Sequence, residues 1–580
     1  MNIRKHIFFS FILVLLFFCT GCQTSSLSKT PEEFDTFTHN LFVKEVQSDS
    51  ITLNYTLANP KQYGITQSAI TFGQFSTEEL ELSYAEIENY LASLKQFSYK
   101  DLTKEQQLTY DILKQYLELE LSSSDYMLYR EALGPNTGLQ AQLPVLLSEY
   151  HFYEKTDIET YLKLLEDLPR YFQQIGTFEV QKSNAGLFMS DTTANSIIEQ
   201  CKNFIADKET NVLIEIFNDR IQTLDFLSSE EITDYKNQNT KLVMEYVIPA
   251  YEGLMEQIEA LKGTGTNEGG LCNFPNGKEY YEYLIASTTG SSRSMRKIDE
   301  MLTEAINNGL NTMIEIANKD LSIFEKADQV VYPLTDPTEI IEYLKVAIQE
   351  NYPSLEDVNY NIKYVHKSLE KDLSPAFYLT PPLDDCLENS IYINNYSAYN
   401  KDNIFPTLAH EGYPGHLFQN VYFNQTSPTP IRTLFAFGGY SEGWATYAEM
   451  DSYSMMNLDS NITSILMNNQ ISTLCMYAQI DLGIHYFGWT KEETARYLDS
   501  YGLPSVDIVD EIYQTMVAEP GNYMKYALGY LEILKLREQA QKQLKTAFSL
   551  KEWNTFFLDI GPAPFEIIEN YMNDWIKECK

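Results

Sequence analysis

Apolar residues recur at helical spacing along most of the chain, and this pattern predicts a mainly α-helical protein. Thr103 followed by Gln106 is typical of a capping box at a helix start. Asp336 followed by Pro337 indicates an N-cap and a first-turn proline before another helix. The apolar stripe after Thr103 consists of Leu108, Ile112, Leu113, Tyr116 and Leu117. Further helical segments are predicted near residues 155–175, 192–218, 240–262, 292–318, 462–485 and 523–546.

Strand signals are few. The best is NSIYINNYS, residues 389–397, where Ile391 and Ile393 alternate with polar neighbours. One composition shift stands out, the glycine-rich GTGTNEGGLCNFPNG at residues 263–277, which predicts a long loop. We expect this loop to separate an N-terminal helical half, residues 34–262, from a C-terminal catalytic half, residues 278–580.

The first 22 residues, MNIRKHIFFSFILVLLFFCTGC, have the pattern of a bacterial lipoprotein signal. A basic start precedes an apolar run that is too short for a membrane span, and Thr-Gly-Cys follows it. We expect removal of residues 1–21, lipid modification of Cys22, a polar tether over residues 22–33, and an anchored protein outside the cytoplasmic membrane. Ordinary secretion and an uncleaved anchor are the alternatives.

The charge is strongly negative, with 42 Lys and Arg against 81 Asp and Glu and a formal net charge of −39. Such a surface repels nucleic acid and anionic bilayers, so we expect neither as a partner, and membrane contact only through the anchor. Five cysteines follow Cys22, at positions 201, 272, 386, 475 and 579. Their dispersal excludes a disulfide framework and a Cys-rich zinc module.

The segment LAHEGYPGHLF, residues 408–418, nearly matches the H-E-x-x-H signature of zinc peptidases, with two extra residues before the second His. On a regular helix, His410 and His416 would point about 120° apart and could not share an ion. Pro414 prevents a regular helix here. A two-residue bulge at residues 413–415, permitted by the flanking glycines, would return His416 to the face of His410. The alternative is a helix start with two surface histidines.

A catalytic zinc needs a third protein ligand and keeps one position for water. GGYSEGWATYAEM, residues 438–450, contains Glu442 and Glu449, which share a helix face about 10 Å apart and cannot both bind one ion. Glu442 stands 26 residues after His416 among small and aromatic residues, so it is the predicted ligand. Glu449 is then a structural residue or one that holds a ligand His. For each Glu taken singly, a solvated helix surface is the alternative.

Four blocks occur in the order seen in a bacterial family catalogued as domain of unknown function 885. They are HEGYPGH, EGWATYAE, DLGIHYFGWTKEE (residues 481–493) and PGNYMKYALGYLEILKLREQA (residues 520–540). GLCNFPNGKEYYEYL, residues 270–284, also resembles that family's mid-chain loop, so the resemblance spans about residues 34–575. The family usually has a second His directly after the motif's last His. Here that position is Leu417, which leaves His416 as the ligand.

The family in turn resembles the helical zinc peptidases of gluzincin type, such as thimet oligopeptidase, angiotensin-converting enzyme and Taq-type carboxypeptidases. The resemblance implies a large helical zincin-like fold, a small β-sheet beside the zinc-binding helix and a central cleft. It also implies one Zn²⁺ per chain, and a role for the strand at 389–397 in holding an extended peptide.

The same resemblance implies roles for residues nearer the C-terminus. Tyr526 would present its hydroxyl to the reacting carbonyl, with Tyr523 as the alternative, and Arg537 could pair with a carboxylate. His485 shares a helix face with Asp481. It would bind substrate or stabilise the oxyanion, or be a core histidine bonded to Asp481.

Together these roles predict a zinc-dependent hydrolase that cleaves peptide bonds of short peptides outside the cytoplasmic membrane. His410, His416 and Glu442 would be the ligands, and Glu411 the general base for metal-activated water. A zinc amidase acting on another exported or cell-wall substrate would share this site. A catalytically inactive peptide-binding lipoprotein is the other alternative.

Overall fold

A computed structural model of the protein describes residues 29–135, 137–356, 358–367, 369–370, 373–396, 404–503 and 506–580. The predicted signal segment and Cys22 lie outside these residues. Within them, none of the helices combines the length and the apolar character needed to cross a bilayer. The predicted tether ends earlier than residue 33, because helix α1 (Pro31–Val46) begins with a capping box between Thr30 and Glu33.

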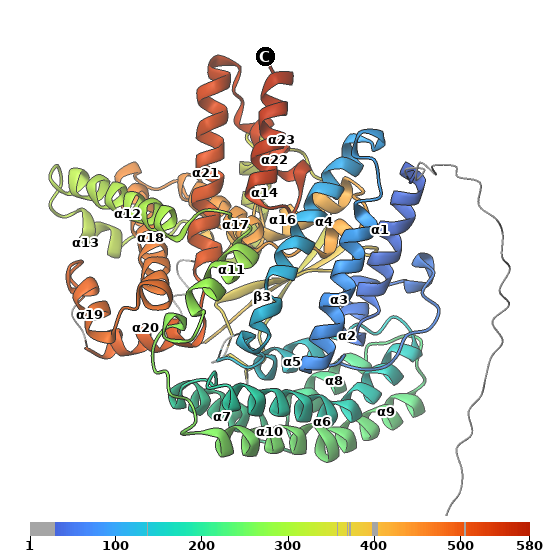
Figure 1. The fold of residues 1–580 in the computed structure, drawn as a ribbon. Coiled ribbons are helices and arrows are strands. Elements are labelled where there is room, and N and C mark those ends of the chain that lie inside the picture. The colour runs from blue at the N-terminus through green and yellow to red at the C-terminus, as the bar shows by residue number, and fades with distance from the viewer. Residues whose placement is uncertain are drawn as a thin grey trace, which may run out of the picture.

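Most of the described chain is helical, and the predicted mainly α class with a small sheet is confirmed (Figure 1). The helices before the sheet are α1, α2 (Ser50–Thr56), α3 (Thr77–Leu94), α4 (Lys104–Ser122), α5 (Leu139–Ser148), α6 (Lys155–Asn184), α7 (Asp191–Ile205), α8 (Val212–Ile221), α9 (Ser229–Leu242), α10 (Ile248–Leu261), α11 (Gly277–Thr289), α12 (Met295–Ala317), α13 (Ile323–Asp328) and α14 (Pro337–Ala347). The helices after it are α15 (Phe405–Glu411), α16 (His416–Gln425), α17 (Gly438–Ser452), α18 (Ser460–Leu482), α19 (Lys491–Asp499), α20 (Val506–Ala518), α21 (Met524–Leu544), α22 (Leu550–Ile560) and α23 (Phe565–Glu578).

The local start signals read from the sequence are present. Thr103 and Gln106 form the predicted capping box before α4, and Asp336 accepts hydrogen bonds from the first amides of α14. The segment predicted near 192–218 is two helices, α7 and α8, because Asn211 caps a new helix start.

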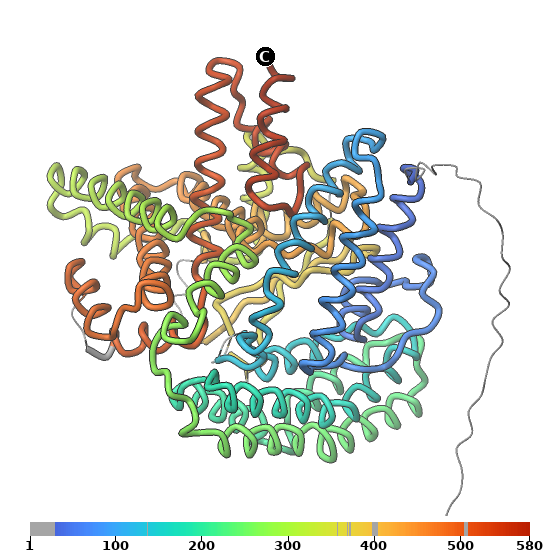
Figure 2. Tube along the Cα trace, in the orientation of Figure 1, coloured from blue at the N-terminus to red at the C-terminus, as the bar shows by residue number. Residues whose placement is uncertain are grey.

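The hydrophobic interior divides differently from the predicted halves. One core draws on Phe72 and on residues between 132 and 258. The larger core draws on residues between 34 and 129, on Leu187, and on residues between 271 and 576. Helices α6 to α10 accordingly lie together along one side, while α1, α3 and α4 stand beside the later helices (Figure 2). The predicted N-terminal half, residues 34–262, therefore contributes to both cores.

The sheet has three strands, β1 (Asn359–Tyr364), β2 (Ala376–Leu379) and β3 (Glu388–Ile393), in the order β1-β3-β2. β3 pairs with β1 in parallel and with β2 in antiparallel fashion. The strand predicted at 389–397 is thus confirmed over its first part as β3, which ends at Ile393, but its expected role needs correction. Because both edges of β3 are paired, it cannot add an extended peptide to the sheet. Edge strand β2 contacts α15.

Candidate metal centre

The HEGYPGH segment joins two helices. We expected a bulge inside one helix, but α15 ends at Glu411 and α16 begins at His416. A Cβ on Gly412 would lie 2.6 Å from the side chain of Ile341, and one on Gly415 would overlap the carbonyl of His410. Only glycine therefore fits at either end of the break. The predicted consequence is observed, since the rings of His410 and His416 lie 4.9 Å apart.

Glu442 from α17 meets both imidazoles. Its Oε2 lies 3.2 Å from His416 Nε2 and 3.5 Å from His410 Nε2. A tetrahedral zinc with ligand bonds of roughly 2.0–2.2 Å separates its ligand atoms by about 3.3–3.6 Å, so these distances fit the ion. Within the described ranges, these three residues form the one group of His, Cys, Asp or Glu close enough to hold a metal.

Glu449 holds the other side of His410. Its Oε2 lies 3.1 Å from His410 Nδ1, and its Oε1 accepts a hydrogen bond from Gln470 at 3.0 Å. In the neutral imidazole, a proton on Nδ1 shared with this carboxylate would leave Nε2 free to bind a metal. The contact to a ligand His that the sequence predicted for Glu449 is present.

Glu411, the predicted base, is the last residue of α15 and is buried. Its Oε2 accepts the backbone N–H of Tyr378 at 2.8 Å, so β2 reaches the centre directly. Burial raises the pKa of the Glu411 carboxyl, against the opposing charges of His410 and His416. The sequence analysis missed Tyr378, because a backbone donor on a four-residue strand leaves no side-chain pattern.

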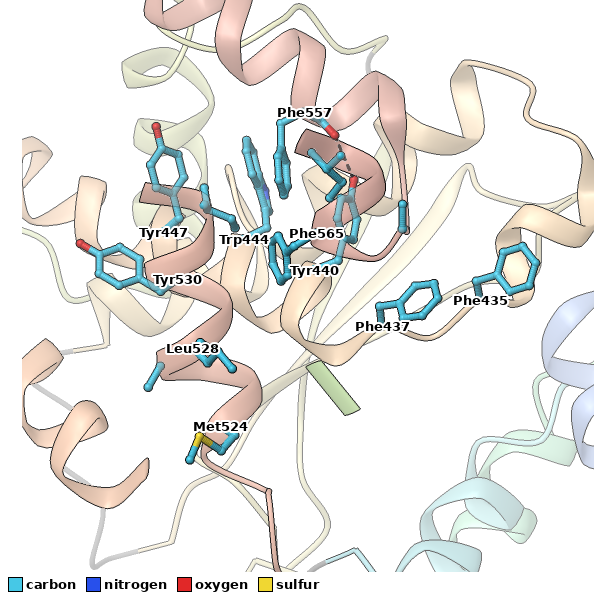
Figure 3. Close-up of a cluster of buried hydrophobic side chains, with 14 of the residues drawn as sticks. Phe435, Phe437, Tyr440, Trp444, Tyr447, Met524, Leu528, Tyr530, Phe557 and Phe565 are labelled. Atoms are coloured by element: carbon cyan, nitrogen blue, oxygen red, sulfur yellow. Dashed lines mark hydrogen bonds between the residues drawn. The ribbon is translucent and has the colours of Figure 1, made fainter. Parts of the chain in front are cut away.

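Helices α17 and α21 cross at glycines. A Cβ on Gly443 would lie 2.5 Å from the carbonyl carbon of Gly529, and one on Gly529 would overlap the carbonyl of Gly439. This close contact between the two helices places the first turn of α21 next to Glu442. The ring of Tyr526 lies 6.2 Å from that of His410, and the charge of Glu442 acts on its hydroxyl. Figure 3 shows Tyr447 of α17 beside Tyr530 of α21.

Lys525 is a second residue that the sequence analysis missed. Its Nζ lies 3.6 Å from Oε1 of Glu442, the oxygen that faces away from the histidines. The one feature of the sequence that pointed to Lys525 was its position directly before Tyr526, in a block that resembles the family. A lysine in the first turn of a helix is ordinarily a solvated residue, and here its side chain is 23% exposed.

The electrostatics of the centre favour a cation. Burial opposes charge on His410, but hydrogen bonds to Glu442 and Glu449 outweigh it and raise the pKa of this imidazole well above its ordinary value. Burial also disfavours the charged form of Glu442. Hydrogen bonds from His410 and His416 outweigh that cost and hold the pKa of the Glu442 carboxyl well below its usual range. The carboxylates thus attract positive charge, which a divalent ion would supply.

Comparison with known proteins assigns the chain to a family. A family model described as "Bacterial protein of unknown function (DUF885)" matches residues 61–572. The chain belongs to the DUF885 family. No curated protein matches this DUF885 chain.

Two solved structures share the fold of this DUF885 protein. One is described as a "putative lipoprotein" from Colwellia psychrerythraea, with a TM-score of 0.82, 19% identity, and coverage of 95% of this chain and 100% of the other. The second, a "putative lipoprotein of unknown function" from Shewanella oneidensis, has a TM-score of 0.63, 17% identity, and coverage of 93% and 99%. The resemblance to gluzincin peptidases stays a prediction.

Tyr526 and Tyr523, the two candidates for the proton donor of the DUF885 site, have different surroundings. Burial, followed by the charges of Glu442 and Glu411, raises the pKa of Tyr526 well above its ordinary value, so its hydroxyl keeps its proton. Tyr523 packs edge-on against Tyr477, with ring centroids 5.1 Å apart. Arg537, expected to pair with a carboxylate, donates its hydrogen bond to the hydroxyl of Tyr447 at 3.1 Å.

The catalytic role expected of His485 is wrong for this DUF885 protein. The side chain is fully buried, and both ring nitrogens bind backbone. Nδ1 accepts the N–H of Leu271 at 3.1 Å, and Nε2 donates to the carbonyl of Met516 at 2.7 Å. Burial lowers the pKa of His485 to about 4, so the ring is neutral. It is a core histidine with no atom left for substrate.

The predicted bond between Asp481 and His485 is also wrong. Asp481 accepts the hydroxyl of Tyr281 and the N–H of Gly521 instead. The spacing of four residues suggested a shared face, but a π turn, η8 (Gly483–Phe487), follows α18 and widens the helix there. Tyr281 lies between the two side chains, since its ring stacks on that of His485 with centroids 5.6 Å apart and its hydroxyl donates to Asp481.

Proposed function

We propose that this DUF885 protein is a zinc-dependent hydrolase that cleaves peptide bonds of short peptides. The observation that supports this most is the meeting of two imidazole Nε2 atoms and one Glu442 oxygen at 3.2 and 3.5 Å, beside the buried carboxyl of Glu411. Three His and Glu ligands with an adjacent carboxyl are typical of catalytic zinc sites, whereas structural sites use four protein ligands. We extend the proposal to a zincin-like fold with a central cleft.

Each residue has a role that follows from its contacts. His410, His416 and Glu442 would hold the zinc, which when bound supplies a Lewis acid and activates water. Glu411 would take a proton from that water and return it to the leaving amine. The N–H of Tyr378 fixes one oxygen of Glu411 and leaves the other for the proton.

Two residues of α21 complete the arrangement. Tyr526 keeps its proton, so its hydroxyl can donate to the negative charge that develops on the reacting carbonyl oxygen. Lys525 lies 3.6 Å from Oε1 of Glu442 and thereby orients Oε2 toward the histidines. This pair places a neutral donor and a cation on the same side of the ligand set.

A peptide is the substrate class that the sheet supports. β2 is an edge strand, and Tyr378 within it donates to Glu411. An extended peptide that lies along an edge strand keeps its backbone in hydrogen-bonding range and its scissile bond near the base. The β2 edge would therefore take the role that the sequence analysis gave to β3.

We propose that the protein acts outside the cytoplasmic membrane, anchored by a lipid on Cys22. The lipoprotein-type N-terminal sequence supports this, and the two solved structures named above are each described as a "putative lipoprotein". The substrate would then be an exported, external or cell-wall peptide rather than a cytoplasmic one.

Metal analysis combined with a peptide screen tests the proposal. We expect about one zinc per chain in the purified protein, loss of zinc in Glu442→Ala, and zinc retained without peptide cleavage in Glu411→Gln. Absence of zinc from the native protein, even after zinc is added, would overturn the proposal. Bound zinc without cleavage of any peptide would refute the peptidase assignment and favour the amidase alternative.

A further inference from the structure

A cavity of about 290 Å³ lies directly beside the candidate metal centre. His416 lines it with the face of α16, and Ser441, which precedes Glu442, lines it from α17. Tyr378 also lines it, and the N–H of that residue donates to Glu411. The cavity therefore borders the ligand set and the strand that fixes the base. Its volume is at the lower end of the range of ligand pockets, roughly 300–1,000 Å³, which suits one side chain better than a whole ligand.

Aromatic rings form one part of the cavity wall, and neutral polar side chains form another. The rings are those of Tyr378, Phe423, Phe435, Phe437 and Tyr440. Figure 3 shows Phe435 and Phe437 on the segment that leads into α17, apart from Trp444 and Phe557, which stack on each other deeper in the core. Aromatic walls offer a large apolar area and the edge-to-face geometry that another aromatic ring prefers.

None of the described residues that line this cavity is a Lys, Arg, Asp or Glu, so no side chain there can act as a counter-ion. A charged side chain entering it would lose its hydration without gaining a counter-ion. A second cavity, of about 520 Å³, differs in this respect, since Arg130, Glu131 and Lys525 line it. The cavity beside His416 therefore offers a charged side chain no counter-ion, whereas the 520 Å³ cavity does.

The polar groups in the lining are neutral. Asn420 Nδ2 donates to the Tyr378 hydroxyl at 3.2 Å, and Asn424 Nδ2 donates to the sulfur of Cys386 at 3.1 Å. Each of these amides keeps a carbonyl oxygen as an acceptor and a second N–H as a donor, and none of these groups carries a charge. Such acceptors suit the hydroxyl of a tyrosine or the N–H of a tryptophan.

We infer that this cavity receives an uncharged aromatic side chain next to the scissile bond. The inference rests on the proposed peptidase function and names its substrate class, peptides with Phe, Tyr or Trp at the residue adjacent to the cleaved bond. Aromatic walls supply the binding surface, neutral acceptors accommodate a polar ring tip, and the missing counter-ion excludes Lys, Arg, Asp and Glu.

The test uses peptides that are identical except at one position, which carries Phe, Tyr, Leu, Ala, Lys or Glu. We expect the zinc-loaded protein to cleave the Phe and Tyr peptides with kcat/KM at least about tenfold above the Lys and Glu peptides. Asn420→Asp places a carboxylate in the wall and is expected to lower that ratio by raising kcat/KM for Lys. Asn203→Asp makes the same charge change at an exposed position of α7 and is expected to leave the profile unchanged.

A second variant narrows the cavity without disturbing the core. Ala436 lines the cavity but is exposed, so Ala436→Trp can be accommodated by the fold. We expect it to reduce cleavage of the Phe and Tyr peptides several-fold and to spare the Ala peptide. Equal loss for all peptides would contradict a pocket for one side chain.

Binding to Glu411→Gln separates this inference from the proposed function. With this variant, fluorescence titration of the same peptides measures recognition without cleavage. Tighter binding of the Phe and Tyr peptides would support the aromatic pocket even if the native protein cleaved none of them. Cleavage by the native protein with a flat or charge-preferring profile would overturn the aromatic pocket and leave the peptidase proposal standing. Equal binding of all peptides would also overturn it.

Discussion

Gly443 on α17 and Gly529 on α21 meet where the two helices cross, and a Cβ on Gly443 would lie 2.5 Å from the carbonyl carbon of Gly529. Glu442 precedes the first glycine, and Tyr526 stands one turn before the second. The crossing therefore fixes the distance between a predicted ligand and a predicted proton donor. Two sequence blocks nearly ninety residues apart form one site because neither helix carries a side chain at the contact.

Replacing Gly529 by Ala tests this contact. The added Cβ would overlap the backbone carbonyl of Gly439, which cannot move aside as a flexible side chain could. We expect the free energy of unfolding to fall by about 1–3 kcal/mol, as overpacking commonly costs, despite the better helix propensity of Ala.

Gly253→Ala is the matched control for Gly529→Ala. Gly253 lies inside α10 with nothing within 4 Å of an added Cβ, so alanine should stabilise the helix by up to about 1 kcal/mol. Thermal or urea unfolding measures both variants. Equal stability of Gly529→Ala and the native protein would mean that the helices separate easily at the crossing.

The sequence predicted the parts of the site that depend on local chemistry. Pro414 disrupts a regular helix and the glycines beside it permit unusual backbone angles, so the return of His416 to His410 could be inferred without a structure. The helix break itself could not be told from a bulge. Glu442 and Glu449 were separable because an α-helix places residues seven apart two turns away from each other.

The parts that the sequence could not predict depend on tertiary contacts. The backbone N–H of Tyr378 and the ammonium of Lys525 reach the centre only because β2 and α21 pack there. The role of His485 was mispredicted because its ring nitrogens bind the backbone of Leu271 and Met516, and such tertiary contacts leave no pattern in DLGIHYF. The helices of residues 34–129 join the larger core through long-range packing that no local pattern encodes.

Glu449→Gln should weaken zinc binding without removing a ligand. The neutral amide keeps the size of the carboxylate but polarises the Nδ1 proton of His410 less, so Nε2 becomes a poorer donor to the metal. Loss of such a partner typically costs 10–100-fold in metal affinity, and we expect a decrease of about that size.

Competition with a chelator of known affinity measures the effect of Glu449→Gln. Glu256→Gln, on the exposed side of α10, removes one negative charge far from any contact with His410 and should leave zinc affinity unchanged. Unaltered affinity in Glu449→Gln would show that the hydrogen bond to His410 has no part in metal binding.

Tyr526→Phe should reduce turnover while zinc is retained. The substitution removes the hydroxyl that would donate to the reacting oxygen and leaves the ring in place. Loss of one such donor lowers kcat by about 10²–10³-fold in comparable sites. Tyr523→Phe makes the same change three residues earlier, on a ring that packs against Tyr477, and should have little effect. A larger loss in Tyr523→Phe than in Tyr526→Phe would transfer the role to Tyr523.

Asp481→Asn should remove a pH dependence of stability. Burial raises the pKa of Asp481 to about 7, although hydrogen bonds from Tyr281 and Gly521 favour the charged form. Between about pH 4 and pH 7 the unfolded chain has released this proton and the folded protein still holds it. The folded state thus binds more protons, and stability falls as pH rises across this window, by on the order of a few kcal/mol.

Asn resembles the protonated form of Asp481, because its amide can donate to Tyr281 while its oxygen accepts the N–H of Gly521. We therefore expect Asp481→Asn to match the native protein near pH 4 and to exceed it in stability near pH 8. Urea unfolding at both pH values measures the difference. Asp207→Asn, at an exposed position, should follow the native curve throughout. If Asp481→Asn gained no stability at pH 8 relative to pH 4, the buried carboxyl would already be ionised near neutral pH without cost to the fold.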